Sequence, residues 1–237
     1  MRRRNVLHFL VLSLTMAVLM ALCPSQAAAQ QKATDADRLG MALEYFQSAK
    51  YHEALLIFQK LDKQYKLNPR FKAYMALCYY YEWDYKKAVG YFDKVLPLLG
   101  GLSPQELSVY HYAAGESYFQ LHIYDKALAY FSRDLKLCYD REKGDIYYRI
   151  GLCHMFREEW QEAYDSYSLA EDYYLRYRDT TTLKARLAQI ANMKRGCQPG
   201  IARDIDKIRS GILKQHPSTP APIASPWPAT VDDSLWQ

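Results

Sequence analysis

The segment Tyr124-Asp125-Lys126-Ala127-Leu128 indicates the architecture of this chain, because three variants of it occur elsewhere in the sequence. Each copy reads aromatic residue, two polar residues, alanine and apolar residue. Successive alanines are 34, 39 and 36 residues apart. A period in this range indicates structural repeats that stack on one another. The four alanines are Ala54, Ala88, Ala127 and Ala163.

Three further positions lie at a constant offset from the alanine in every copy. Twelve residues before it stands a small residue, nine before it a ring, and four after it an aromatic residue. A small residue lets a second helix approach closely, and the rings fill the space between helix pairs. One pair cannot bury its apolar face alone, so the pairs must stack. In chain order these positions hold Ala42, Ala76, Gly115 and Gly151; Tyr45, Tyr79, Tyr118 and His154; and Phe58, Phe92, Phe131 and Tyr167.

The pattern resembles the tetratricopeptide repeat, whose period is 34 residues and whose small, aromatic and alanine positions have these offsets. The likeness runs from about Asp35 to Tyr177. It implies an all-α fold, a right-handed α-solenoid of about four helix pairs. The four repeats are expected at residues 35–68, 69–102, 108–141 and 144–177.

Local signals agree with helices that begin and end in this frame. Asn68 precedes Pro69, and Ser103 precedes Pro104, which is the order of an N-cap followed by proline at the first helical position. Glu106, three residues after Ser103, predicts a capping box. Pro97 predicts an early end to the second helix of the second repeat.

The signature fades after Tyr177, and C-terminal capping helices are expected at residues 178–216. Asp179 suits an N-cap. Gly196 and Pro199-Gly200 predict an interruption, followed by an amphipathic helix with isoleucines at intervals of 4, 3 and 4 residues. Residues 217–237 are rich in Pro, Ser and Ala and are expected to form a disordered tail.

The first 29 residues have the order of a secretory signal peptide. Three arginines are followed by an apolar run from Val6 to Leu22 and by small residues up to Ala29. Cleavage is expected before Gln30, which predicts an exported protein, in the periplasm or cell envelope if the source is bacterial. After cleavage no integral membrane span is expected.

Other interpretations of this segment remain open. The apolar run could nearly span a bilayer as a retained anchor, although the small-residue site favours cleavage. A twin-arginine signal is weakly indicated by the arginines. Lipid attachment at Cys23 is disfavoured because the bulky Leu22 stands before it.

Charge gives no indication of nucleic-acid binding. The chain has 31 basic and 26 acidic side chains, and removing the three N-terminal arginines leaves 28 basic ones, a net charge of +2. No block of like charge stands out.

The sequence contains no recognisable catalytic apparatus, and neither an enzyme, a cofactor nor a metal site is expected. Cys78 and Cys153 occupy equivalent positions in two different repeats, and both are expected to be small, reduced core residues. A disulfide, if one forms, would most plausibly involve Cys197. Cys153 and His154 are neighbours on one helix and point about 100° apart, so they cannot form a nucleophile–base pair.

The family resemblance implies a protein partner, bound as a peptide or protein segment in a concave groove lined by the first helix of each repeat. The leading hypothesis is an envelope scaffold or adaptor with an apolar and aromatic groove. The alternative is a structural subunit of an envelope or outer-membrane assembly complex that uses its convex face or end cap. The predicted groove residues are Leu43, Phe46, Arg70, Leu77, Tyr80, Tyr81, Tyr112, Glu116, Phe119, Tyr148, Leu152 and Phe156.

Overall fold

The computed structural model describes residues 30–32 and 34–211. The predicted signal peptide, Cys23 and the predicted tail lie outside these residues. The chain divides into two compact units, Met1–Leu67 and Asn68–Gln237, which are described separately.

The first unit contains one helix pair. A helix covers residues 34–47, and α2 follows at Tyr51–Tyr65. Ala42 on the first helix and Ala54 and Phe58 on the second are fully buried, as the repeat pattern requires. The Asp35 carboxylate accepts hydrogen bonds from Gln64 and Tyr65 of α2. The pair is therefore joined by packing along its length and by polar contacts at one end.

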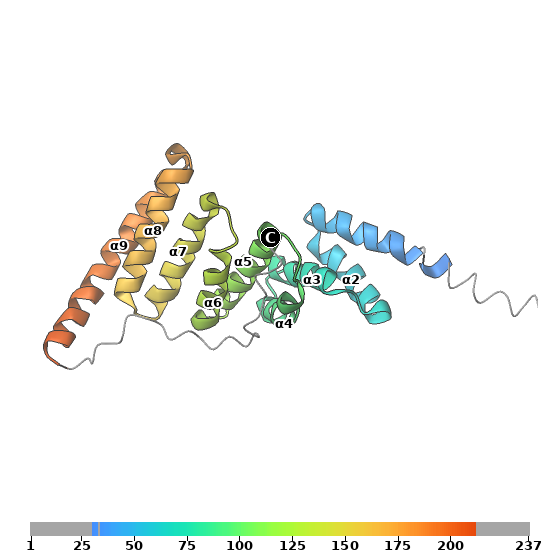
Figure 1. Cartoon of the computed structure of the whole chain (residues 1–237), viewed down its shortest axis with the longest axis horizontal. Coiled ribbons are helices and arrows are strands. Elements are labelled where there is room, and N and C mark those ends of the chain that lie inside the picture. Colours follow the sequence, from blue (N-terminus) through green and yellow to red (C-terminus); the bar gives the residue numbers. More distant parts are fainter. Residues whose placement is uncertain (1–29, 33, 212–237) are drawn as a thin grey trace, which may run out of the picture. The chain divides into compact units, whose positions relative to one another are not determined.

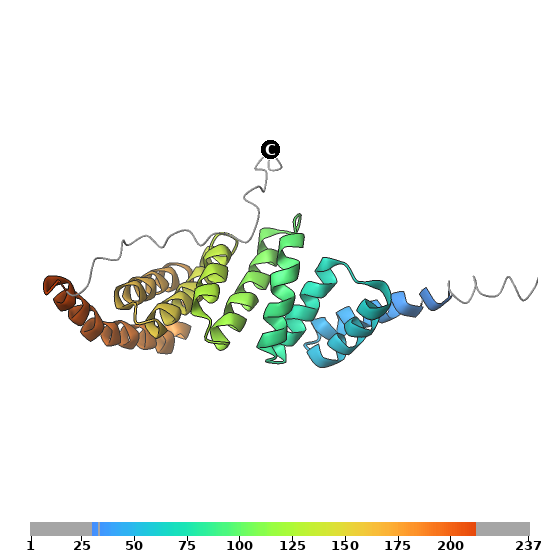
Figure 2. The same ribbon diagram turned by 90° about the horizontal axis from the view of Figure 1, so that it is seen from below.

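The second unit is a succession of helices, each of which packs against the next (Figures 1 and 2). Three antiparallel pairs are followed by one long helix, and the predicted all-α architecture of stacked pairs is confirmed for the described residues. The elements are α3 (Pro69–Tyr81), α4 (Tyr85–Val95), the 3-10 turn η1 (Leu96–Leu98), α5 (Pro104–Gln120), α6 (Tyr124–Asp134), α7 (Asp140–Phe156), α8 (Trp160–Tyr177) and α9 (Thr180–Arg209).

The repeat positions pack as their spacing predicts. A methyl group placed on Gly115 would lie 2.7 Å from the Phe131 ring, and one on Gly151 would lie 2.6 Å from the Tyr167 ring. In each of these two pairs the aromatic ring therefore packs directly against the small residue of the facing helix. All four repeat alanines are fully buried.

Each turn inside a pair is closed by one residue in the left-handed conformation, five residues before the repeat alanine. The next residue donates its N–H to the carbonyl of the ring position nine before the alanine, for example Ile123 to Tyr118 at 3.0 Å and Asp84 to Tyr79 at 2.9 Å. This 6→1 bond is that of a Schellman motif. The left-handed residues are Ala49, Trp83, His122 and Glu158. These positions were not predictable from the sequence, because none of the four residues is glycine.

Most of the helix-end predictions are confirmed. Asn68 accepts the N–H of Phe71 at 3.2 Å, and Ser103 accepts that of Glu106 at 3.2 Å. α4 ends at Val95, two residues before Pro97. The capping box differs from prediction, because the Glu106 carboxylate binds the Arg70 guanidinium and the Tyr110 hydroxyl.

The predicted interruption at Gly196 and Pro199-Gly200 is wrong, because α9 runs through both. Packing against α8 explains why. Ile190 and Cys197 are buried in a cluster with the inner face of α8, and Gly200 lies directly against the Trp160 ring. This burial offsets the hydrogen bond that proline removes from the helix.

Candidate functional site

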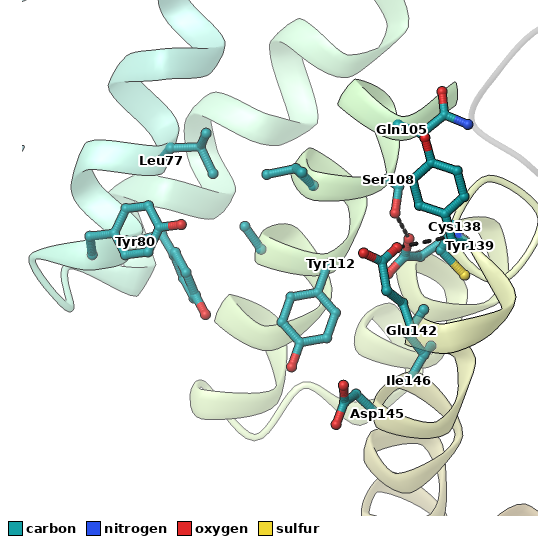
Figure 3. A pocket seen from close by; sticks show the side chains of 14 residues that line it. Leu77, Tyr80, Gln105, Ser108, Tyr112, Cys138, Tyr139, Glu142, Asp145 and Ile146 are labelled. Atoms are coloured by element: carbon teal, nitrogen blue, oxygen red, sulfur yellow. Dashed lines mark hydrogen bonds between the residues drawn. The ribbon is translucent and has the colours of Figure 1, made fainter. Parts of the chain in front are cut away.

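The second unit contains a cavity of about 570 Å³. Leu77 and Tyr80 of α3 lie on one side of it, Ile146 of α7 lies on the opposite side, and Tyr112 of α5 stands between them (Figure 3). The end of α6 and the turn that follows it complete the wall. The lining residues are Leu77, Tyr80, Tyr81, Gln105, Ser108, Val109, Tyr112, Ala113, Asp134, Cys138, Tyr139, Glu142, Asp145 and Ile146.

Four of the predicted groove residues meet at this cavity: Leu77, Tyr80, Tyr81 and Tyr112. Both tyrosine hydroxyls are neutral at pH 7 and can donate hydrogen bonds, and burial raises the pKa of Tyr80 and of Tyr112, which keeps them neutral at more alkaline pH as well. Leu77 is buried rather than exposed, although it borders the cavity.

Other predicted groove residues lie elsewhere in the second unit. Arg70 forms a bidentate ion pair with Glu106, with both N–O distances at 2.9 Å. Glu116 is buried and forms an ion pair with Arg149, whose guanidinium lies 5.5 Å from the centre of the Phe119 ring. Phe119 also packs against Phe156, with ring centres 5.8 Å apart. Leu43 and Phe46 belong to the first unit.

Tyr148 and Leu152 differ from the prediction that they face an open groove. Tyr148 is buried against Tyr167, and the Arg186 guanidinium of α9 lies 4.4 Å from the centre of its ring. Leu152 packs against the same cluster. The part of α9 that precedes the predicted break, including Arg186, covers positions that the fourth repeat would otherwise present.

The ionisable side chains that line the cavity are mainly acidic. Its lining contains three carboxyl groups, Asp134, Glu142 and Asp145, and no Lys, Arg or His. Asp145 is compensated by the Arg178 guanidinium and also accepts a hydrogen bond from the Tyr174 hydroxyl. The Glu142 carboxylate accepts a hydrogen bond from the backbone N–H of Tyr139, the N-cap of α7, at 3.2 Å.

Asp134 is the least expected of these groups, since only 1% of its surface is exposed. The Ser108 hydroxyl donates to Asp134 Oδ1 at 2.5 Å, while Oδ2 has no hydrogen-bond partner among the described residues. Burial raises the pKa of Asp134 to about 7, with Glu142 adding to the effect. A buried carboxylate with one unpartnered oxygen is costly to the fold.

Sequence reasoning missed Asp134, although the repeat frame contained the signal. Seven residues after the repeat alanine the other repeats have Leu61, Val95 and Ala170, all apolar and all buried. Only the third repeat has an acid in this slot. Comparison of the repeats with one another would have marked it.

The cysteines have the character that the sequence predicts. Cys78 and Cys153 are fully buried, and burial raises the pKa of each thiol to about 12. Cys138 and Cys197 are also free. Thiols of this kind are not nucleophiles at neutral pH.

The described residues contain neither a candidate metal site nor a candidate membrane span. Residues 30–32 and 34–211 contain no group of three His, Cys, Asp or Glu side chains placed to hold a metal ion. Within the same ranges, no helix combines the length and the apolar character needed to cross a membrane.

Comparison with known proteins shows similarity at the level of structure. No protein-family model and no curated protein sequence matches the chain. Among solved structures, "MamA 41-end from Desulfovibrio magneticus RS-1" aligns at 18% identity and a TM-score of 0.53, over 74% of this chain and 96% of that one. The APC/C hetero-tetramer Cut9–Hcn1 aligns at 13% identity and a TM-score of 0.52, over 69% of this chain and 29% of that one. These similarities support a tetratricopeptide-like repeat fold.

Proposed function

We propose that this protein is a non-enzymatic interaction scaffold that binds a polypeptide segment on the surface formed by α3, α5 and α7. The observation that carries the proposal is the convergence of Leu77, Tyr80, Tyr81 and Tyr112 on one cavity. Its volume of about 570 Å³ is enough for one or two side chains of a partner. The tetratricopeptide-like fold supports the same role by analogy.

The walls of the cavity suit a peptide with apolar side chains. Tyrosine rings offer large contact areas at low cost in side-chain entropy, and their hydroxyls are able to bond a peptide backbone. Val109 and Tyr139 border the cavity and are about half exposed, so a bound segment would cover apolar surface beyond the cavity itself.

Site-specific photo-crosslinking tests the proposal. A photoreactive phenylalanine replaces Val109, which lines the cavity, or Leu175 of α8, which does not and is similarly exposed. We expect position 109 to capture a defined polypeptide in cells and position 175 not to capture the same one. Equal capture at both positions, or capture at neither, would argue against a binding surface on α3, α5 and α7.

A second candidate is an assembly subunit that uses its C-terminal end. Ile205 and Ile208 of α9 are exposed, so these two positions of the predicted isoleucine stripe are not covered by the described residues. The same photoreactive group at Ile208 tests this role. Capture from Ile208 alone would favour the second candidate over the first.

The proposed function also includes export of the protein from the cytoplasm. The order of basic, apolar and small residues before Gln30 supports a cleaved signal and a place of action in the periplasm or cell envelope. Intact-mass measurement of the exported form is expected to give a chain that begins at or near Gln30. A lipid-modified Cys23 or a retained Met1 would overturn this location.

A further inference from the structure

We infer that the cavity binds the positively charged end of a lysine or arginine side chain of the partner polypeptide, between Asp134 and Glu142. This inference rests on the proposed function, because it specifies the chemistry of the bound segment. The bound cation would lie at the carboxyl groups, and its methylene stem would contact the apolar and aromatic wall formed by Leu77, Tyr80 and Tyr112.

The first support is the charge balance around the cavity. The nearby cations are already paired with other carboxylates: Lys143 with Asp140, Arg149 with Glu116 and Arg178 with Asp145. Neither Asp134 nor Glu142 forms an ion pair with a lysine or arginine of the described residues. The two acids therefore form a site of negative charge that the fold itself does not neutralise.

The second support is the unpartnered oxygen of Asp134. Oδ2 is buried and belongs to a residue that lines the cavity. A bound ammonium or guanidinium group would supply the missing hydrogen bond and compensate the charge in the same contact. The slot holds an apolar residue in every other repeat, so the stacking of repeats does not require an acid there.

The surroundings select an organic cation over a metal ion. The described residues offer no group of three ligands for a metal, whereas the cavity has four tyrosines and four aliphatic side chains. Such walls suit the stem of a basic side chain and the attraction of its charge to a ring face. The protein uses this contact elsewhere, with Lys126 4.8 Å from the Tyr118 ring centre.

The predicted C-terminal tail, residues 217–237, is a poor occupant on grounds of charge. Residues 217–237 contain Asp232 and Asp233 but no lysine or arginine. An acidic segment would be repelled by Asp134 and Glu142. An external segment with a basic residue next to apolar ones has the complementary character.

Binding of a cation should depend on pH. The groups that face Asp134 are Ser108 from α5, Glu142 from α7, and Cys138 in the turn after α6. With a pKa of about 7, Asp134 is partly protonated in the free protein at neutral pH. A cation favours the ionised form, so affinity should rise as the pH increases through 7, and protons should be released on binding.

Selection from a library of random heptapeptides tests the inference with the full chain and with Asp134→Asn. The control is Asp172→Asn, which alters an exposed carboxylate of α8 outside the cavity. We expect wild type and the control to enrich lysine or arginine beside apolar residues. Asp134→Asn should lose the basic residue and keep the apolar ones. For a selected peptide, replacing its basic residue by norleucine should weaken binding to wild type about tenfold or more.

The outcomes separate this inference from the proposed function. Enrichment of apolar residues without a cation would overturn the inference and leave the scaffold role intact. Enrichment of cations that survives in Asp134→Asn, or is lost in Asp172→Asn as well, would also overturn the inference. A library that yields no peptide at all would count against both. Thermal melts of the two variants establish that each is folded.

Discussion

The ring of Tyr167 lies directly on the backbone of Gly151, so that a methyl group on Gly151 would come within 2.6 Å of Tyr167 Cε1. Tyr167 is fully buried and cannot turn away. Gly151→Ala should therefore destabilise the protein by about 1–3 kcal/mol through overpacking, even though alanine is the better helix former. Chemical denaturation measures the change.

Gly90→Ala is the matched control for that substitution. Gly90 also lies inside a helix, but an added methyl group would meet no atom within 4 Å. The helix preference of alanine then acts alone and should stabilise the protein by about 0.5–1 kcal/mol. If both variants changed stability in the same direction, the close approach of α7 and α8 at Gly151 would be wrong.

Asp134→Asn should stabilise the fold at pH 8 by between about 1 and 4 kcal/mol. The folded pKa of about 7 exceeds the unfolded value of 3.8, so the folded state holds its proton more tightly. Asp134 therefore costs stability progressively as the pH rises from about 4 to 7. The gain from asparagine should be full above pH 7 and small at pH 4. A gain independent of pH would show that charge burial is not its cause.

Pro199→Ala should stabilise the protein by about 1–3 kcal/mol, because proline inside a helix removes a backbone hydrogen bond. Pro104→Ala is the control, since Pro104 occupies the first turn of α5, where its missing N–H costs little. Denaturation midpoints of the two variants provide the comparison. An unchanged or lower midpoint for Pro199→Ala would mean that α9 is broken at this point in solution.

Cys78 and Cys153 should react with a thiol reagent only as the second unit unfolds. Both are fully buried, and burial raises their thiol pKa to about 12. Cys138 is partly exposed and should react first. The unfolded protein in concentrated denaturant supplies the reference rate. Rapid labelling of Cys78 and Cys153 in native protein would contradict the repeat frame itself.

The fold was largely predictable because its determinants are local and periodic. The positions of Ala127 and Gly115 fix which faces of α5 and α6 meet, and Asn68 and Ser103 mark helix starts by their own hydrogen bonds. α9 was not predictable in this way. Its continuity through Pro199 depends on packing against α8, which no short window of sequence contains.

The candidate site was predictable only in part, for the same reason. Leu77 and Tyr112 follow from the repeat register, since both occupy first helices. The loss of Tyr148 from the surface follows from the course of α9, a tertiary contact. Asp134 comes from the second helix of its repeat, where the family resemblance places no binding residue.

The order of packing in the second unit has a kinetic consequence. Its main contacts join helices that are adjacent in the chain or one repeat apart, as between α3 and α5. Proteins built on such short-range contacts fold fast, and they open from their ends rather than all at once. Amide hydrogens of α5 and α6 should therefore exchange with solvent most slowly, and those at the end of α9 most quickly. The part of the cavity that lies on α5, α6 and α7 would then persist while the C-terminal end opens and closes.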